Sequence, residues 1–134
     1  MAMLKRIHVL GLLVVLMSCT LASSAQRYNG RWEFLGQSHV DGKNDHDKIH
    51  VDRNETFRAI QLGIKGGTIE FYRVVVHFDS GQDHDVQVKQ RIRANEKTRP
   101  IDLPGDRRRI RSVEVWYGKE GWRSRPTLNL WGLR

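Results

Sequence analysis

Apolar and polar side chains alternate along most of the chain that follows residue 58. The apolar members of this alternation include Ile60, Leu62 and Ile64, then Val86 and Val88, Val113 and Val115, and Leu128 and Leu130. A period of two places apolar side chains on one face of a sheet and polar ones on the other. No stretch after the first 25 residues repeats apolar residues at helical spacing. The pattern therefore predicts an all-β protein, rich in the β-branched and aromatic residues that suit strands.

Glycine, proline and aspartate separate these runs and mark turns. Gly66-Gly67 has the length of a tight β-hairpin turn, and Asp79 to Gln82 has the composition of another. Pro104-Gly105 and Gly118 to Gly121 indicate later turns. Around seven to eight antiparallel strands at these intervals are typical of a β-sandwich or a jelly-roll-like barrel. Two packed sheets give each apolar face the second layer that it needs.

The N-terminus has the pattern of a secretory signal peptide. Lys5 and Arg6 precede an apolar run from Val9 to Met17, which is shorter than the roughly 20 residues of a membrane-spanning helix. Small residues at Ser23 and Ala25 fit cleavage after residue 25. We therefore expect residues 1–25 to be removed and residues 26–134, a chain of 109 residues, to form one exported domain. The domain is then periplasmic or secreted.

Cys19 leaves a second form of processing open. Leu16 to Cys19 resembles the lipobox of bacterial lipoproteins, in which the cysteine becomes the acylated N-terminus. Because Met17 departs from that pattern, cleavage after Ala25 is the preferred prediction. In either case the domain that follows contains no cysteine, which excludes disulfides, thiolate metal ligands and a cysteine nucleophile.

The chain is strongly basic, with 23 Lys and Arg residues, 15 Asp and Glu residues and a formal net charge of +8. Removal of residues 1–25 takes away Lys5 and Arg6 and no acid, which leaves 21 basic and 15 acidic residues and a charge of +6. Such a charge favours contact with anionic surfaces. Since export separates the domain from chromosomal DNA, we expect an anionic glycan, a lipid headgroup or another envelope polyanion as partner, and not nucleic acid.

Arginine and tryptophan residues form the candidate ligand site. Arg91 and Arg93 alternate along one strand, so their side chains share a face. Arginine suits bidentate contacts with phosphate, sulfate or carboxylate, and tryptophan can stack on a sugar ring. In the alternative interpretation, the arginines solvate a sheet face while the tryptophans cover the core. The candidate ligand-binding residues are Arg91, Arg93, Arg108, Arg111, Trp116 and Trp122.

A polar loop and a repeated tripeptide contain the candidate metal ligands. The loop spans residues 37–48, between an expected strand at Trp32 to Gly36 and a short one around Ile49. Its oxygen-bearing side chains suit calcium, although the EF-hand spacing is absent. Asp-His-Asp occurs at residues 45–47 and 83–85, and zinc accepts imidazole and carboxylate ligands. If the fold brings these stretches together, the metal ligands are Asp45, His46, Asp47 and His84; otherwise both are solvated turns.

The sequence contains no recognisable catalytic motif. Ser80 and Ser112 lack the nucleophile-elbow pattern, and no His-Glu-x-x-His is present. Glu33, Glu70 and Glu114 are candidate acids, as polar strand faces usually provide. His77 is interpreted as a strand residue whose ring is satisfied by neighbours. The sequence therefore favours a protein that binds and does not catalyse.

Four segments of the chain are recognisable as a set. They are Phe57 to Leu62, Val74 to Phe78, Ile101 to Arg107 and Ile110 to Tyr117. Together they resemble a family of short exported bacterial proteins known only as a domain of unknown function. The resemblance implies a compact β-rich exported domain and assigns no catalytic residue. In physical terms, Pro104 fixes φ and Gly105 accepts a positive φ, so this part of the motif predicts a type II turn.

Three functions remain open from the sequence. The first is a non-catalytic envelope protein that binds an anionic or carbohydrate ligand through Arg and Trp side chains. The second is a calcium or zinc protein, or an enzyme, that uses the Asp/His loops. The third is a structural module that binds another protein through a sheet edge.

Overall fold

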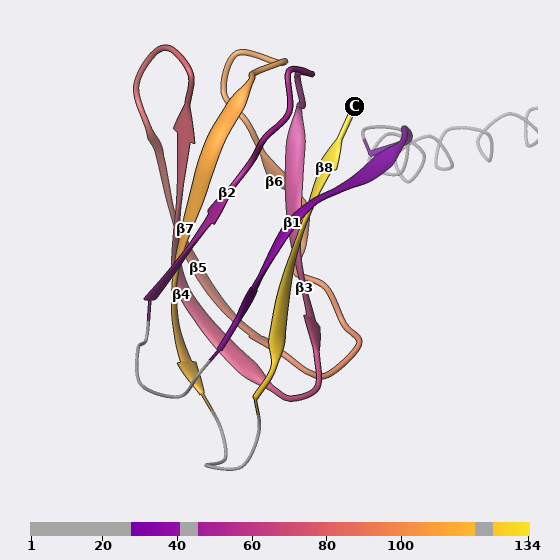
Figure 1. Cartoon of the computed structure of the whole chain (residues 1–134), viewed down its shortest axis with the longest axis vertical. Coiled ribbons are helices and arrows are strands. Elements are labelled where there is room, and N and C mark those ends of the chain that lie inside the picture. Colours follow the sequence, from indigo (N-terminus) through magenta and orange to yellow (C-terminus); the bar gives the residue numbers. More distant parts are fainter. Residues whose placement is uncertain (1–27, 41–45, 120–124) are drawn as a thin grey trace, which may run out of the picture.

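The computed structural model describes residues 28–40, 46–119 and 125–134, and within these ranges the protein is all-β (Figure 1). The expected signal segment, Cys19, Asp45 and Trp122 lie outside the described residues. No helix of the described part is long and apolar enough to cross a membrane. The strands are β1 (Trp32–His39), β2 (His46–His50), β3 (Ala59–Lys65), β4 (Ile69–Phe78), β5 (His84–Ile92), β6 (Ile101–Asp102), β7 (Ile110–Lys119) and β8 (Thr127–Leu133).

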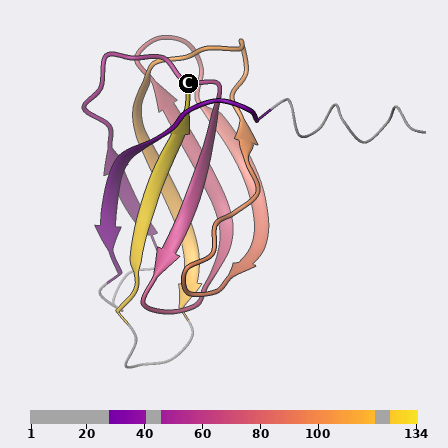
Figure 2. The same ribbon diagram turned by 90° about the vertical axis from the view of Figure 1, so that its right-hand side faces the viewer.

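The strands form two four-stranded antiparallel sheets. One sheet has the order β1-β8-β3-β6 and the other β2-β7-β4-β5. Among the described strands, only β4 and β5 follow one another in sequence and also pair. Every other connection crosses between the sheets, which is the connectivity of a jelly roll. Figure 2 shows one sheet lying in front of the other, so the prediction of an all-β fold with two antiparallel sheets is confirmed.

The apolar faces of the two sheets pack against each other and form the core. Burial of one such side chain stabilises the fold by about 1.5–3 kcal/mol, which makes the core the main stabilising element of a domain without cysteine. Fully buried residues include Ile60, Leu62, Leu128 and Leu130 from the first sheet and Val74, Val76, Val113 and Val115 from the second.

The predicted turns have different outcomes. Asp79 to Gln82 joins the paired strands β4 and β5, with Gly81 at φ 90°, as a hairpin requires. Gly105 has φ 82°, the value that the third position of a type II turn needs. The hairpin predicted at Gly66-Gly67 is wrong, because β3 and β4 belong to different sheets. The two glycines connect the sheets, and a two-residue spacing does not distinguish a hairpin from such a crossing.

A bulge in β4 sets the outer face of the second sheet. The register with β7 shifts between Phe71 and Arg73, so Tyr72 is an additional residue and is exposed. Beyond the shift Arg73 pairs with Trp116 and Val75 with Glu114. The bulge therefore sets which residues of β4 lie beside Trp116 and Glu114 of β7 on the face that points away from the core.

We expect Gly132→Ala to destabilise the fold by about 1–3 kcal/mol, as over-packing of a core does. An added Cβ at Gly132 would lie 2.7 Å from Leu35 Cδ1 and 2.8 Å from Phe57 Cδ1, and both side chains are buried. The measurement is the free energy of unfolding in urea.

Gly118→Ala is the matched control. Its added Cβ would meet the Tyr72 hydroxyl at 2.6 Å, but Tyr72 is 47% exposed and can swing away. The control should therefore change the free energy of unfolding by well under about 1 kcal/mol. Equal losses in both variants would contradict the packing described for Gly132.

Candidate functional site

The structure does not gather the predicted ligand-binding residues into one site. Arg91 lies on β5 opposite Glu70, and Arg93 follows the end of the same strand. Arg111 lies at the start of β7, beside the other end of β4. Trp116 is half-buried on the outer face of the second sheet. Trp122 lies outside the described residues.

The Arg108 side chain makes its contacts within the protein. Its guanidinium carbon lies 3.9 Å from the centroid of the Phe78 ring. Its nitrogens donate to the Ser80 carbonyl at 2.7 Å and the Pro104 carbonyl at 3.3 Å. These contacts join the β4–β5 turn to the turn before β7, so the side chain already has its partners within the protein.

The two histidines proposed as zinc ligands lie at opposite edges of the second sheet. His46 is on β2 and His84 on β5, with β7 and β4 between them, a separation of three strand spacings or roughly 14 Å. Asp47 instead accepts a hydrogen bond of 2.5 Å from the Tyr117 hydroxyl. Among the described residues, no group of three or more His, Cys, Asp or Glu side chains is arranged to hold a metal ion. Asp45 lies outside those residues.

The outer face of the second sheet holds a cluster of His46, His77, Asp83 and Glu114, here called the histidine–carboxylate cluster. Glu114 Oε2 lies 2.6 Å from His46 Nε2, and Glu114 Oε1 lies 2.6 Å from His77 Nε2. His77 Nδ1 lies 2.9 Å from Asp83 Oδ2. The His77 ring therefore lies between two carboxylates, one at each of its nitrogens. The cluster thereby connects β2, β7, β4 and the β4–β5 turn.

Trp116 extends this network along the sheet. The His46 ring stacks on it at 4.4 Å, and the Arg73 guanidinium carbon lies 4.6 Å from its centroid. Arg73 also forms two hydrogen bonds with Asp85, of 2.9 and 2.6 Å. The hydrogen bond from Arg73, and the proximity of its charge, hold the pKa of Asp85 below its ordinary value against the opposing effect of desolvation. Trp116 is therefore covered from two neighbouring strands.

Glu114 is the central charge of the cluster. Partial burial would raise its pKa, but the hydrogen bonds from His77 and His46 outweigh that effect and hold the pKa below the ordinary value of 4.5. Both carboxylate oxygens of Glu114 are thus engaged by the two histidines. The interpretation of His77 as a strand residue with a satisfied ring agrees with its two bonds. Nothing in the sequence indicates that these residues lie together, because it is the strand order β2-β7-β4 that brings them side by side.

Many cations of the fold are paired with acids. Glu33 is within 3.6 Å of nitrogens from Arg31, Arg53 and Arg134, Arg73 pairs with Asp85, and Arg109 lies 3.7 Å from Asp79. These pairs neutralise much of the positive charge on both sheets. Other cations of the described residues, such as Lys89, Arg107 and Arg111, form no ion pair with a described acid, and several of these unpaired cations lie together at one end of the sandwich.

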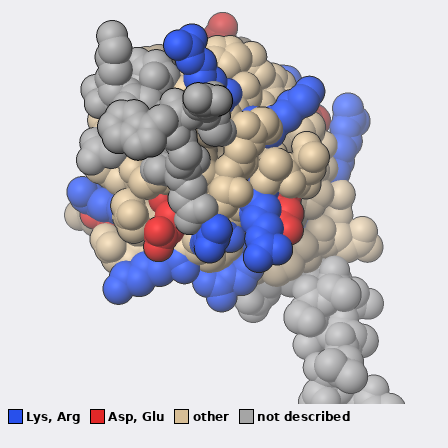
Figure 3. Space-filling model, turned by 90° about the horizontal axis from the view of Figure 1, so that it is seen from below, with Lys and Arg blue, Asp and Glu red and all other residues tan. Residues whose placement is uncertain are grey.

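Four such cations, Lys65, Arg93, Lys97 and Arg125, lie at the end of the sandwich where β3 and β5 stop and β8 begins, here called the basic end. Figure 3 shows several Lys and Arg side chains on the lower face of the molecule. Lys65 ends β3 opposite Thr127, and Arg125 lies just before β8. The loop after β5 is tied to this end by hydrogen bonds from Asn95 N to Ile64 O and from Ile64 N to Glu96 O. None of the four side chains forms an ion pair with a described acid.

An aromatic pair adjoins the basic end on the outer face of the first sheet. Phe34 and Trp131 meet edge to face with their centroids 5.4 Å apart, and Phe34 is 41% exposed. Lys97 Nζ lies 4.4 Å from the Trp131 centroid. Apolar ring surface beside free positive charge can contact a sugar and its anionic substituents at the same time. Of the residues gathered here, the sequence pattern singled out Arg93 but not Lys65, Lys97, Arg125 or Phe34.

The chain matches the family described as "Domain of unknown function (DUF2541)" over residues 10–132, and it therefore belongs to that family. The expected membership of a family without an assigned activity is confirmed. No curated protein and no solved structure matches the chain.

We expect Glu114→Gln to lower stability by about 2 kcal/mol at pH 5.5, because a partly buried carboxylate loses its charge-assisted hydrogen bonds. The pKa of Glu114 is depressed in the folded state, so its contribution is present above the unfolded value and is lost as pH falls through the folded value. The difference between wild type and variant should therefore shrink as pH falls below about 4.5. Urea unfolding between pH 3 and 5.5 measures it.

Glu70→Gln is the control, since it removes an exposed carboxylate from β4 without touching either histidine. Its stability difference from wild type should be small throughout this range. A Glu114→Gln difference that stays constant from pH 5.5 to pH 3 would contradict the depressed pKa of Glu114.

Proposed function

We propose that this member of the DUF2541 family is an exported, non-catalytic binding module that attaches to an anionic glycan of the cell envelope through its basic end. The observation that carries the proposal is the contrast in pairing. Several arginines on the sheets are held by Glu33, Asp85 and Asp79, whereas the four cations of the basic end lie together and form no ion pair with a described acid. Unpaired cations at one end of a domain attract a polyanion, and no ion pair within the protein has to be broken when they bind it.

Export supports the choice of partner. The basic n-region, the apolar run and the small residues before Gln26 are typical of a signal peptide. An exported basic domain meets anionic polysaccharides and lipid headgroups before it meets nucleic acid. Periplasmic or secreted location, and anchoring through Cys19, are parts of this proposal that rest on the sequence.

The aromatic pair favours a glycan over a lipid headgroup. Phe34 and Trp131 offer ring surface next to Lys97, and sugar rings pack on such surfaces while their carboxylate or sulfate groups reach the cations. A lipid headgroup layer would use the charges alone. The histidine–carboxylate cluster joins β2, β7 and β4 through Glu114, which fits a structural role for these residues within a binding module.

We expect the triple variant Lys65→Gln, Arg93→Gln, Arg125→Gln to bind a sulfated or uronic-acid polysaccharide about 10–100-fold more weakly than wild type. Three exposed charge contacts of up to about 1 kcal/mol each account for a loss of this size. The salt dependence of binding should also become shallower, because fewer charge contacts remain to be screened. Isothermal titration calorimetry at several salt concentrations measures both effects.

The triple variant Lys89→Gln, Arg107→Gln, Arg111→Gln is the matched control. It removes the same charge from exposed positions outside the basic end. The control should keep most of the affinity for the polysaccharide, and equal losses in both triple variants would show that binding depends on total charge only.

Phe34→Ala should weaken binding to the polysaccharide and leave binding to anionic lipid vesicles unchanged. If vesicles bind more tightly than polysaccharide and Phe34→Ala has no effect, the ligand is a lipid surface.

A further inference from the structure

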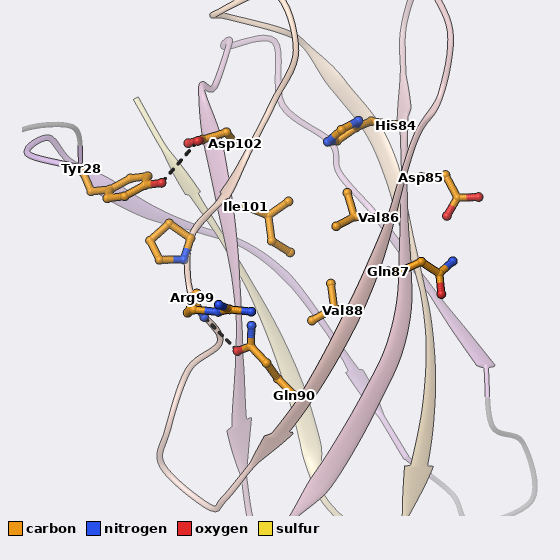
Figure 4. Close-up of a pocket in the computed structure, with 11 residues that line it drawn as sticks. Tyr28, His84, Asp85, Val86, Gln87, Val88, Gln90, Arg99, Ile101 and Asp102 are labelled. Carbon is orange, nitrogen blue, oxygen red and sulfur yellow. Dashed lines mark hydrogen bonds between the residues drawn. The ribbon is translucent and has the colours of Figure 1, made fainter. Parts of the chain in front are cut away.

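A groove of about 680 Å³ runs between the open edges of the two sheets, where β5 and β6 face each other (Figure 4). Its walls come from β5, from the segment leading into β6 and from Tyr28. This volume lies within the range of small-molecule sites in proteins. The groove is separate from both the histidine–carboxylate cluster and the four cations of the basic end.

The middle of the groove is apolar. Val86 and Val88 point from β5 toward Ile101 on the opposite wall (Figure 4). Val88 and Ile101 are largely buried, at 4% and 8% exposure, whereas Val86 is only half-buried and packs on the core from the side. Because these aliphatic side chains are partly exposed to solvent in the groove, an apolar group that packs on them would be bound favourably.

One end of the groove carries the side-chain donors of Arg99 and Gln90. The Arg99 guanidinium points into the groove beside Gln90 and makes no ion pair with a described acid (Figure 4). The backbone N–H of Arg99 donates to Gln90 Oε1 at 3.2 Å, which leaves the Gln90 amide nitrogen next to the guanidinium. Two neighbouring side-chain donors, one of them charged, suit a carboxylate.

The other end has a different polarity. Tyr28 donates a hydrogen bond of 3.3 Å to Asp102 Oδ2, and half-buried His84 lies across from them. An acid at this end disfavours a ligand that is anionic along its whole length. Arg99 is the one Lys or Arg among the described residues that line the groove, which matches a single negative charge better than a doubly charged phosphate.

Both walls of the groove are held by the fold. β5 is paired with β4 along its length. The opposite wall is fixed by the pairing of Ile60 with Ile101 and by backbone hydrogen bonds from Thr98 N to Leu62 O and from Leu103 N to Arg58 O. Because the groove is preformed, ligand binding needs little ordering of the protein, and the free-energy cost of that ordering is small.

We infer that this groove binds a small amphiphile with one carboxylate, such as a medium-chain carboxylic acid. The carboxylate contacts Arg99 and Gln90, and the apolar chain lies over Val86, Val88 and Ile101. The three residue steps from Arg99 to Asp102 span roughly 10 Å of extended backbone, a length that suits a medium alkyl chain. The site is independent of the glycan proposal, since it uses neither the basic end nor the aromatic pair.

The test is a titration of the purified protein with octanoate, followed by calorimetry and by amide NMR shifts. Octanoate should shift the amides of residues 84–90 and 99–102, and affinity should rise about fourfold per added methylene from hexanoate to decanoate. Arg99→Gln should weaken octanoate binding about tenfold, as loss of a charge-assisted contact does, and leave octanol binding unchanged.

Val86→Trp and Gln87→Trp form a matched pair on β5. Both residues border the groove, but the Val86 side chain points across it toward Ile101 whereas the Gln87 side chain points to the opposite side of β5 (Figure 4), so only Val86→Trp should abolish binding of octanoate and octanol. The NMR spectrum of each variant reports its fold, and the exposed Arg99→Gln substitution keeps the test decisive if Val86→Trp misfolds. The inference is overturned if octanoate shifts amides elsewhere, or if it binds Arg99→Gln as tightly as wild type.

Discussion

Each sheet of this protein has one apolar face, and the burial of these two faces against each other is the constraint on which the rest of the structure depends. It places Val74, Val113 and Leu62 in one core and leaves every second residue of each strand on an outer surface. A domain without cysteine has no covalent alternative for this stabilisation. The outer faces and the open edges are what remains for function.

The two outer faces and the ends use their charges differently. On the sheet β2-β7-β4-β5, Glu114 contacts both His46 and His77, and Arg73 pairs with Asp85. The charged side chains on this face therefore connect neighbouring strands. At the basic end, Lys65 and Arg125 lie where strands stop and no described acid meets them. Positive charge that the fold does not neutralise is the feature most suited to an external partner.

Part of the fold and of the candidate site follows from local patterns. The alternation at Val113 and Val115 predicts which side chains are buried, because a strand turns successive residues to opposite faces. The positive φ of Gly105 follows from Pro104-Gly105 in the same local way. The sequence pattern at Arg91 and Arg93 singled out one residue of the basic end, Arg93. It could not exclude Arg108, whose guanidinium contacts the Phe78 ring and donates hydrogen bonds to two backbone carbonyls within the protein.

By itself the sequence determined the strands, their buried faces, the absence of cysteine from the domain and its excess positive charge. Tertiary structure alone decided that Gly66-Gly67 crosses between sheets, that His46 meets Glu114 and not His84, and that β5 and β6 leave a groove between them. The physical reason is the range of the interactions. Burial on one face is a property of neighbouring residues, whereas strand order and register depend on pairings between distant segments, in which the whole core decides the most stable combination.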